Sequence, residues 1–494
     1  MKRLLIYMFG VLLFIAVNPL ASYSQDDTNP VDEFGSFDVS NPMDKQSSLG
    51  ALLGYTDIGG EQFVGIRLQP EFVLGKLGFG LDVPILFNIE DWKLRTEEYK
   101  DGIGWLRMIR YVSWGVKKRD PFYIRVGDLT GSYIGYGMLV DNYTNSISFE
   151  KRKLGASFDL LVGNLVGIEG LYSDFDMSSF NMFAIRPYVK PFGRTSIPIV
   201  KTIDFGFTYV TDHDKTKIKL TDSTDYQNEF IEDGMNAWAL DMGIMPVNMS
   251  FMQVKVYAQY GNLLKNKSQL LQDSINHHIA AGFDGDSAMM VNYGGSHGFG
   301  IGVDFKFKAG GDALRVDMRI ERLWYEKYFM PQFFNAGYEF NKDAKLFALS
   351  QTDGKKGIYG ALAITAMEKV RIGGSLMIPD NVSEIAPAVV TLDLDASKLM
   401  EKVIIQGQYV KGGLIGLEDA FKLDDRSLMN IRLAYRMYKF LIVGMDYKWT
   451  WSKVTDEDGS LRFKATNYAY PYIGFNMPLN FGNQNKAIDF NTEE

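Results

Sequence analysis

The feature of this sequence that most constrains its fold is a two-residue alternation of apolar with polar or small side chains. The alternation fills segments of ten to thirteen residues from about position 47 to about position 476. A period of two places each apolar set on one face of a β-strand. Because a tilted strand of about 9–11 residues crosses a bilayer, each segment is long enough to span a membrane.

One clear example lies at residues 77–87. Phe79 and its apolar partners would share one face of the strand, while Gly78, Gly80 and Asp82 would share the other. Phe205, Phe305 and Val443 belong to comparable sets elsewhere. We predict about 20 such strands, at 47–56, 62–74, 76–87, 105–117, 121–130, 154–162, 165–173, 180–190, 200–211, 236–245, 250–261, 297–308, 312–325, 357–367, 369–379, 387–395, 402–411, 428–438, 440–453 and 463–476.

Short and long connections alternate along most of the chain. Tight turns are expected at Gly75, Lys117–Asp120, Gly163–Asn164, Pro246–Met249, Lys308–Asp312, Met367–Lys369 and Tyr438–Lys439. Longer polar loops are expected at 88–104, 131–153, 212–235, 262–296, 326–356, 412–427 and 453–462. The segment 191–199 is long for a turn, and 57–61 is short for a loop.

This asymmetry is typical of outer-membrane barrels, which have short periplasmic turns and long extracellular loops. We therefore predict an all-β fold, a single closed antiparallel transmembrane β-barrel of about 18–20 strands. An even strand number places both ends of the barrel on the periplasmic side. That parity favours 18 or 20 strands over 19.

The N-terminus has the composition of a secretion signal. Lys2 and Arg3 precede an apolar run at 4–17 that is too short for a membrane-spanning helix. We predict a signal peptide at 1–24, a periplasmic leader at 25–46, the barrel at 47–476 and a periplasmic tail at 477–494. The expected location is the cell outer membrane. A mean hydropathy of -0.10 excludes a polytopic helical membrane protein, which needs apolar runs of about 20 residues.

Composition excludes several other classes. The chain has no cysteine, so it has no lipoprotein cysteine, no disulfide and no thiolate metal site. The net charge is -8, from 52 basic and 60 acidic residues, and no basic stripe is present. Nucleic acid is therefore not an expected partner. The expected partners are outer-membrane lipids and small polar solutes, and we predict no cofactor.

The polar faces of the strands carry charges of both signs, which we predict to line the barrel lumen. In a membrane barrel the apolar face meets lipid and the polar face lines the interior. The alternative is the solvated face of an ordinary sheet. The predicted lumen residues are Arg67, Glu71, Asp82, Arg125, Lys255, Asp304, Lys306, Arg315, Asp317, Arg319, Glu321, Arg432, Arg436, Asp446 and Lys448.

Aromatic residues gather near the expected strand ends. They include Trp105, Trp114, Trp324, Tyr325, Tyr328, Trp449, Trp451, Tyr468, Tyr470 and Tyr472. Girdles of Trp and Tyr at the two bilayer interfaces would explain this distribution. Ordinary β-propensity, which also enriches aromatics in strands, is the alternative.

The most distinctive run of the chain is YIRVGDLTGSYIGYGMLVDNY, at 123–143. Together with RLQPEFVLGKLGFGLD, at 67–82, it resembles uncharacterised, porin-like outer-membrane barrels of Gram-negative bacteria. The resemblance covers about a fifth of the chain. It implies a fold and a location, but no substrate and no site residues.

The glycine-rich part of this run lies in the long loop 131–153, which is too apolar for full exposure to solvent. We predict that it folds inward and narrows the pore, with Tyr133, Tyr136, Asp141 and Tyr143 as constriction residues. An outer loop packed on its neighbours is the alternative. Loop 262–296 has near-helical apolar spacing and predicts a short amphipathic helix, and the segment 414–423 is similar.

Four histidines were considered as catalytic or metal-binding groups: His213, His277, His278 and His297. None has a partner at a diagnostic spacing, and Ser296 and His297 would point to opposite faces of a strand. We therefore predict no enzyme and no metal site. A carboxylate or serine beside His213 or His297 at the outer rim would revive a hydrolase interpretation.

Barrel size guides the functional prediction. Barrels of about 16 to 18 strands enclose an aqueous channel, whereas those of about 22 strands carry a plug. The predicted leader is too short for a plug domain. We predict a porin-like channel for small polar solutes. The alternative is a structural or assembly barrel whose lumen is sealed by ion pairs and inward loops.

Overall fold

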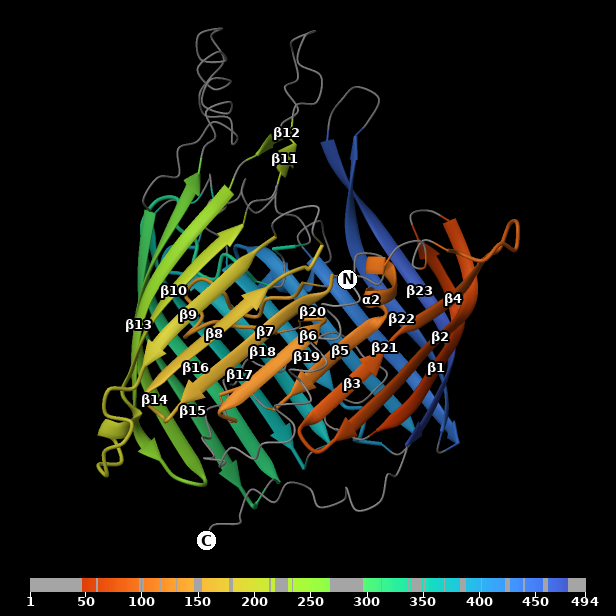
Figure 1. Ribbon diagram of the computed structural model, residues 1–494. Helices are drawn as coiled ribbons and strands as arrows, with labels where there is room; N and C mark the ends of the chain where they lie inside the picture. Colours follow the sequence, from red (N-terminus) through yellow and green to blue (C-terminus); the bar gives the residue numbers. More distant parts are fainter. Residues whose placement is uncertain are drawn as a thin grey trace, which may run out of the picture.

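The computed structural model describes residues 47–478, with gaps at 59–60, 97–98, 100–101, 116, 119, 130, 146–152, 177–180, 213–214, 218–229, 233, 267–295, 312, 336–337, 340–348, 350–351, 353, 368, 383–387, 401, 423–426, 439 and 456–460. The predicted signal peptide, leader and most of the tail lie outside these residues. Within them the chain folds as one antiparallel β-barrel (Figure 1).

The strands follow one another around the barrel, and each pairs with the next along the chain, except that β2 pairs with both β3 and β4, β3 pairs with β5, and β10 pairs with β13. Their bounds are β1 Ser48–Ile58, β2 Glu61–Leu74, β3 Leu77–Leu81, β4 Val83–Asn88, β5 Ile109–Trp114, β6 Phe122–Gly127, β7 Gly155–Val162, β8 Val166–Tyr172, β9 Phe183–Val189, β10 Asp204–Asp212, β13 Gly234–Asn248, β14 Met252–Asn266, β15 Ser296–Ala309, β16 Leu314–Tyr325, β17 Lys355–Ala366, β18 Val370–Pro379, β19 Ala388–Asp395, β20 Val403–Leu414, β21 Ser427–Tyr438, β22 Leu441–Thr455 and β23 Leu461–Pro478.

The barrel closes because its first strand pairs with its last. β1 pairs with β2 on one side and with β23 on the other, where Ser48 lies opposite Pro478. β3 and β4 are two parts of one wall strand interrupted at Asp82, so the closed barrel has 20 strands. The predicted all-β barrel, its even strand number and its paired ends on the short-turn side are confirmed.

The apolar faces of the strands point outward. Phe205 on β10 is 42% exposed and Val443 on β22 is 40% exposed, whereas Asp204 on the opposite face of β10 is only 6% exposed. A water-soluble barrel would reverse this arrangement. The exposed apolar exterior therefore faces lipid, as expected of a transmembrane barrel.

The predicted strand 105–117 was wrong in its first part. Residues Gly102–Arg107 form the six-residue helix α2, and β5 begins only at Ile109. The apolar residues of this stretch do not alternate before Ile109, because Trp105 and Leu106 are neighbours. No helix in the described part of the chain is long and apolar enough to cross a membrane.

Other connections differ in detail from the predictions. The long periplasmic connection after β9 is compact and ends in the 3-10 helix η2, Val200–Thr202. Beyond β10, the strands β11 (Lys215–Lys217) and β12 (Phe230–Glu232) form a separate hairpin. In the described part of the segment 414–423, Leu414 ends β20 and the helical residues form the 3-10 helix η3, Leu417–Phe421. The helix predicted in 262–296 falls largely outside the described residues.

A charge on the lipid-facing side tests this orientation. Leu240 lies near the middle of β13 and is 50% exposed. Replacing it by arginine is expected to lower the free energy of unfolding by about 2–4 kcal/mol, because the guanidinium would enter hydrocarbon. Urea unfolding in lipid vesicles measures the effect, with Leu240→Met as the control. Equal stability of the two variants would contradict a lipid-facing position.

Candidate functional site: the barrel lumen

The loop after β6 turns into the barrel. Its two ends are held together by backbone hydrogen bonds, with Ser132 and Tyr143 donating to each other at 2.9 and 2.7 Å. Gly135 and Gly137 have positive φ values of 62° and 91°, which a glycine adopts without strain. The segment between the paired ends, 133–142, is thereby presented to the inner wall.

A second loop, the one after β16, packs against the first. Val140 forms a parallel bridge with Phe334, and the amide of Gln332 donates to the carbonyl of Met138 at 2.8 Å. Phe329 and Phe333 are fully buried in the same apolar cluster. The sequence around them, YFMPQFF at 328–334, is as apolar as the first loop. The apolar composition that predicts an inward position for the first loop therefore also predicts one for this second loop, which the sequence analysis missed.

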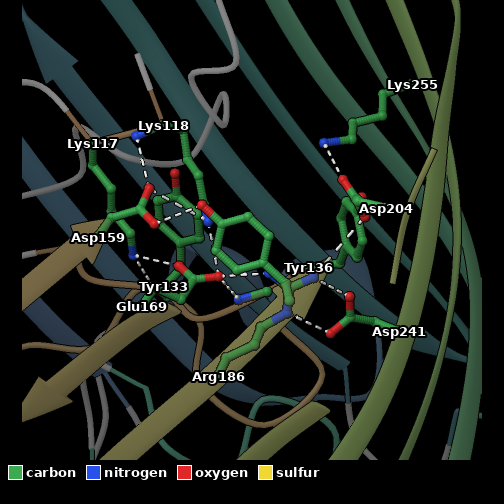
Figure 2. A network of polar contacts seen from close by, with 12 residues as sticks. Lys117, Lys118, Tyr133, Tyr136, Asp159, Glu169, Arg186, Asp204, Asp241 and Lys255 are labelled. Atoms are coloured by element: carbon green, nitrogen blue, oxygen red, sulfur yellow. Dashed lines mark hydrogen bonds and ion pairs between the residues drawn. The ribbon is translucent and has the colours of Figure 1, made fainter. Parts of the chain in front are cut away.

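The carboxylate of Glu169 is the centre of the charge network under the first loop (Figure 2). It is completely buried on β8 and lies 2.8 Å from Arg186 Nη1, 2.9 Å from Lys118 Nζ and 3.3 Å from Lys117 Nζ. It also accepts a hydrogen bond from the amide of Gly135 at 3.2 Å. Three cations from the turn before β6 and from β9 therefore converge on one anion that also holds the loop.

Arg186 extends the network to the neighbouring strands. Its Nε donates to Asp241 on β13 at 2.8 Å. The hydroxyl of Tyr136 donates to Asp204 on β10 at 2.6 Å, and Lys255 on β14 lies 3.6 Å from the same carboxylate. Tyr136 thus anchors the tip of the loop to the inner wall, as Figure 2 shows.

A further anchor lies across the lumen on β15 to β17. Arg319 is 1% exposed, donates to Asp304 at 2.8 Å and lies 3.7 Å from Asp141 of the loop. The hydroxyl of Tyr359 donates to Asp141 at 3.3 Å. Burial raises the pKa of Asp141 to about 6, although Arg319 and Tyr359 oppose the rise.

The rest of the wall, β18 to β22 and β2, carries both buried and partly exposed inward polar groups: Glu71, Gln406 and Arg432 are buried. Thr391, Asp393, Gln408 and Asn430 are neither buried nor fully exposed. The side chain of Asp446 is 33% exposed and pairs with Arg432 through two hydrogen bonds of 2.7 and 2.6 Å. The partly exposed groups of this wall mark an accessible side of the lumen, and the two loops cover the other side.

The predicted lumen residues lie on the face opposite the apolar exterior. Glu71, Asp82, Asp304, Asp317, Arg319, Glu321 and Arg432 are buried, and Arg67, Arg125, Lys255, Lys306, Arg315, Arg436 and Asp446 are partly exposed. Lys448 lies on β22, with its side chain outside the described set. The four constriction residues are also buried: Tyr133, Tyr136, Asp141 and Tyr143.

The central residues of the network were missed by the sequence analysis. Glu169, Arg186 and Asp241 occupy polar-face positions of predicted strands, so the alternation could have placed them in the lumen. Their role depends on contacts with the loop 131–153, and the spacing of residues along the sequence does not reveal those contacts. Lys117 and Lys118 were assigned only to a tight turn, although both reach Glu169.

The predicted aromatic girdle is only partly right. Trp324 lies on the outward face of β16, but Trp105 belongs to α2. Tyr472 faces inward and is 7% exposed, with the guanidinium of Arg432 5.5 Å from its ring. Tyr328 packs against the inner apolar cluster. The predictions for Tyr472 and Tyr328 are therefore corrected, and that for Trp105 is corrected only in its assignment to a strand.

His297 does lie beside a carboxylate. Its Nε2 is 2.9 Å from Glu326 Oε2, and its ring stacks on Tyr260 at 5.9 Å. The adjacent Ser296 is buried on the lumen side, so it is not presented to this pair. Within the described residues, no group of three or more His, Asp or Glu side chains is arranged to hold a metal ion. His213, His277 and His278 lie outside those residues.

The closed 20-strand barrel, its lipid-facing exterior and its charged lumen define an outer-membrane β-barrel protein. No protein-family model and no characterised sequence matches the chain. Three solved structures of outer-membrane proteins share a distant likeness with it, and each covers 88% of the chain.

The first is the ferric citrate transporter FecA, with 9% identity over 79% of that chain and a TM-score of 0.37. The second is Wzi, a carbohydrate-binding barrel involved in capsule assembly in Escherichia coli, with 10% identity over 85% and a TM-score of 0.32. The third is OccK5 of Pseudomonas aeruginosa, with 12% identity over 98% and a TM-score of 0.29. Likeness at this level does not assign a function.

Removing the central anion tests the network. Glu169→Gln keeps the shape of the side chain but leaves Arg186, Lys117 and Lys118 with less compensating charge. Breaking a buried ion pair typically costs about 3–5 kcal/mol, and we expect a loss of that size in unfolding experiments. The control is Asp380→Asn, which breaks the exposed pair with Arg322 at the outer rim and should change stability little. Equal effects of the two substitutions would contradict a structural role for Glu169.

Proposed function

We propose that this protein is a porin-like channel that passes small polar solutes along the accessible side of its lumen. The observation that carries the proposal is the difference between the two sides. Ion pairs beneath the two inward loops are buried, whereas β18 to β22 also carry inward polar groups that keep partial contact with solvent, namely Thr391, Asp393, Gln408 and Asn430. A wall of hydroxyl, amide and charged groups is suited to hydrated solutes.

Barrel size is consistent with this role. Twenty strands enclose more space than the 16 to 18 strands of barrels with an open aqueous channel. The two loops occupy part of that space and would narrow the channel without a separate plug domain. We propose a non-enzymatic role, because the described lumen presents paired charges and no nucleophile activated by a base.

A second candidate is a structural or assembly barrel that transports nothing. It is favoured by the fully buried contacts of Glu169, Arg186 and Arg319, which fit a sealed lumen. The two candidates differ in one measurable property. A channel gives stepwise ion currents when the purified protein enters a planar bilayer, and a sealed barrel gives none.

Removing the first loop tests whether it constricts the channel. Because Ser132 and Tyr143 already lie side by side, residues 133–142 can be replaced by a short glycine linker without opening the barrel. We expect a larger single-channel conductance, since the loop would no longer occupy the lumen. Unchanged conductance would rule out a constriction, and absence of current in both proteins would reject the channel.

A matched pair of point variants separates loop displacement from general damage. A Cβ added at Gly243 would lie 1.9 Å from the hydroxyl of Tyr136, so Gly243→Ala must displace the side chain that anchors the loop tip to Asp204. A Cβ at Gly407 meets no atom closer than 4.0 Å, so Gly407→Ala is the control. We expect higher conductance only for Gly243→Ala.

A further inference from the structure

The barrel wall is much shorter on one side than on the other. β5 to β9 contain six to eight residues each, whereas β13 to β16 contain 12 to 15. At about 3.3 Å per residue and a tilt of about 40°, the short strands rise roughly 15–20 Å. That is less than the outward apolar band of about 25 Å in outer-membrane barrels. In Figure 1 the yellow strands β7 and β8 end below the green strands β13 and β14.

Charged groups lie directly above the short strands. Arg107, at the end of α2, lies 3.6 Å from Asp174 and 3.6 Å from Asp176. Since α2 precedes β5 and Asp174 follows β8, these ion pairs bridge the tops of β6 and β7. Ionised groups are excluded from the hydrocarbon core by their cost of desolvation. Asp174 is buried, and the side chains of Arg107 and Asp176 are 35% and 30% exposed, so a membrane boundary at or below this level keeps both exposed groups out of hydrocarbon.

The outward aromatic residues are lower on this side as well. Tyr172 is six residues after Val166, the first residue of β8, and its ring contacts Phe175 at 5.3 Å and Phe183 at 6.5 Å. On the tall side, Trp324 is ten residues after Leu314, the first residue of β16. Aromatic side chains of this kind settle at the membrane–water interface. The membrane–water interface therefore lies lower along β5 to β9 than along β16.

We propose that the outer leaflet is thinned where it meets β5 to β9, so that this wall is an interaction surface for lipid of short hydrocarbon span. A hydrophobic surface shorter than the bilayer is accommodated by local thinning, at a modest cost per ångström. Keeping the bilayer at full thickness would instead extend hydrocarbon above the upper ends of these strands, where the backbone is no longer paired in the sheet. This surface is independent of whether the lumen conducts.

Nitroxide labels at two matched positions test the proposal, because the chain has no cysteine of its own. Tyr172→Cys and Ile320→Cys place labels on outward faces, each six residues above the start of a strand that follows a periplasmic turn. The protein is reconstituted in phosphatidylcholine vesicles, and the access of oxygen and of a water-soluble nickel chelate gives the depth of each label. We expect the label at 172 to lie shallower than the label at 320 by on the order of 5–10 Å.

Further labels make the outcome decisive. A label on Ile168, lower on the same wall, should lie in hydrocarbon. Phe183→Cys, six residues above the end of β9 at Val189, replaces the first variant if Tyr172→Cys does not fold. Equal depth at 172 and 320 would overturn the proposal. Loss of access to both oxygen and nickel, with spin–spin broadening, would mean that a second copy covers the wall, and would overturn it equally.

Discussion

The structure depends on one constraint, the pairing of every wall strand on both edges within a closed ring. Hydrocarbon offers no water to an unpaired amide or carbonyl, so an open edge in the membrane would cost several kcal/mol for each group. The register between β1 and β23 removes that edge, from Ser48 opposite Pro478 to Gly54 opposite Tyr472. Closure gives the barrel an outward apolar face and an inward polar face. It also brings the start of β1 and the end of β23 to the same side of the membrane.

Closure leaves a lumen whose polar face must itself be satisfied. On the covered side the two inward loops provide the partners. Gly135 and Tyr136 bond to carboxylates of the wall, and Asp141 lies against Arg319. On the accessible side the wall charges pair with each other across strands, as Arg432 does with Asp446, and the partly exposed groups keep contact with solvent. The covered side of the lumen is therefore the side where the loops supply hydrogen-bond and ion-pair partners to the polar groups of the wall.

Much of the fold could be predicted because alternation is a local signal. Phe79 and Val443 were placed on the outward face from spacing alone, and the turns around Gly75 and Gly163 follow from residues that adopt positive φ. The apolar character of loop 131–153 also suggested that it turns inward. The helix α2 could not be predicted, because a helix of six residues, fewer than two turns, is too short to show a periodicity. The partners of Glu169 come from the turn before β6 and from the loop after it. The spacing of residues along the sequence does not show that these two segments are in contact.

The central claim, that the lumen has a covered and an accessible side, can be measured by thiol accessibility. Thr208 on β10 and Thr391 on β19 both point inward, but Thr208 is 3% exposed beneath the loops and Thr391 is partly exposed. Each is replaced by cysteine in the otherwise cysteine-free chain, and reaction with a small charged thiosulfonate is followed in lipid vesicles. The account predicts fast labelling at 391 and little at 208. Comparable labelling rates at the two positions would contradict it.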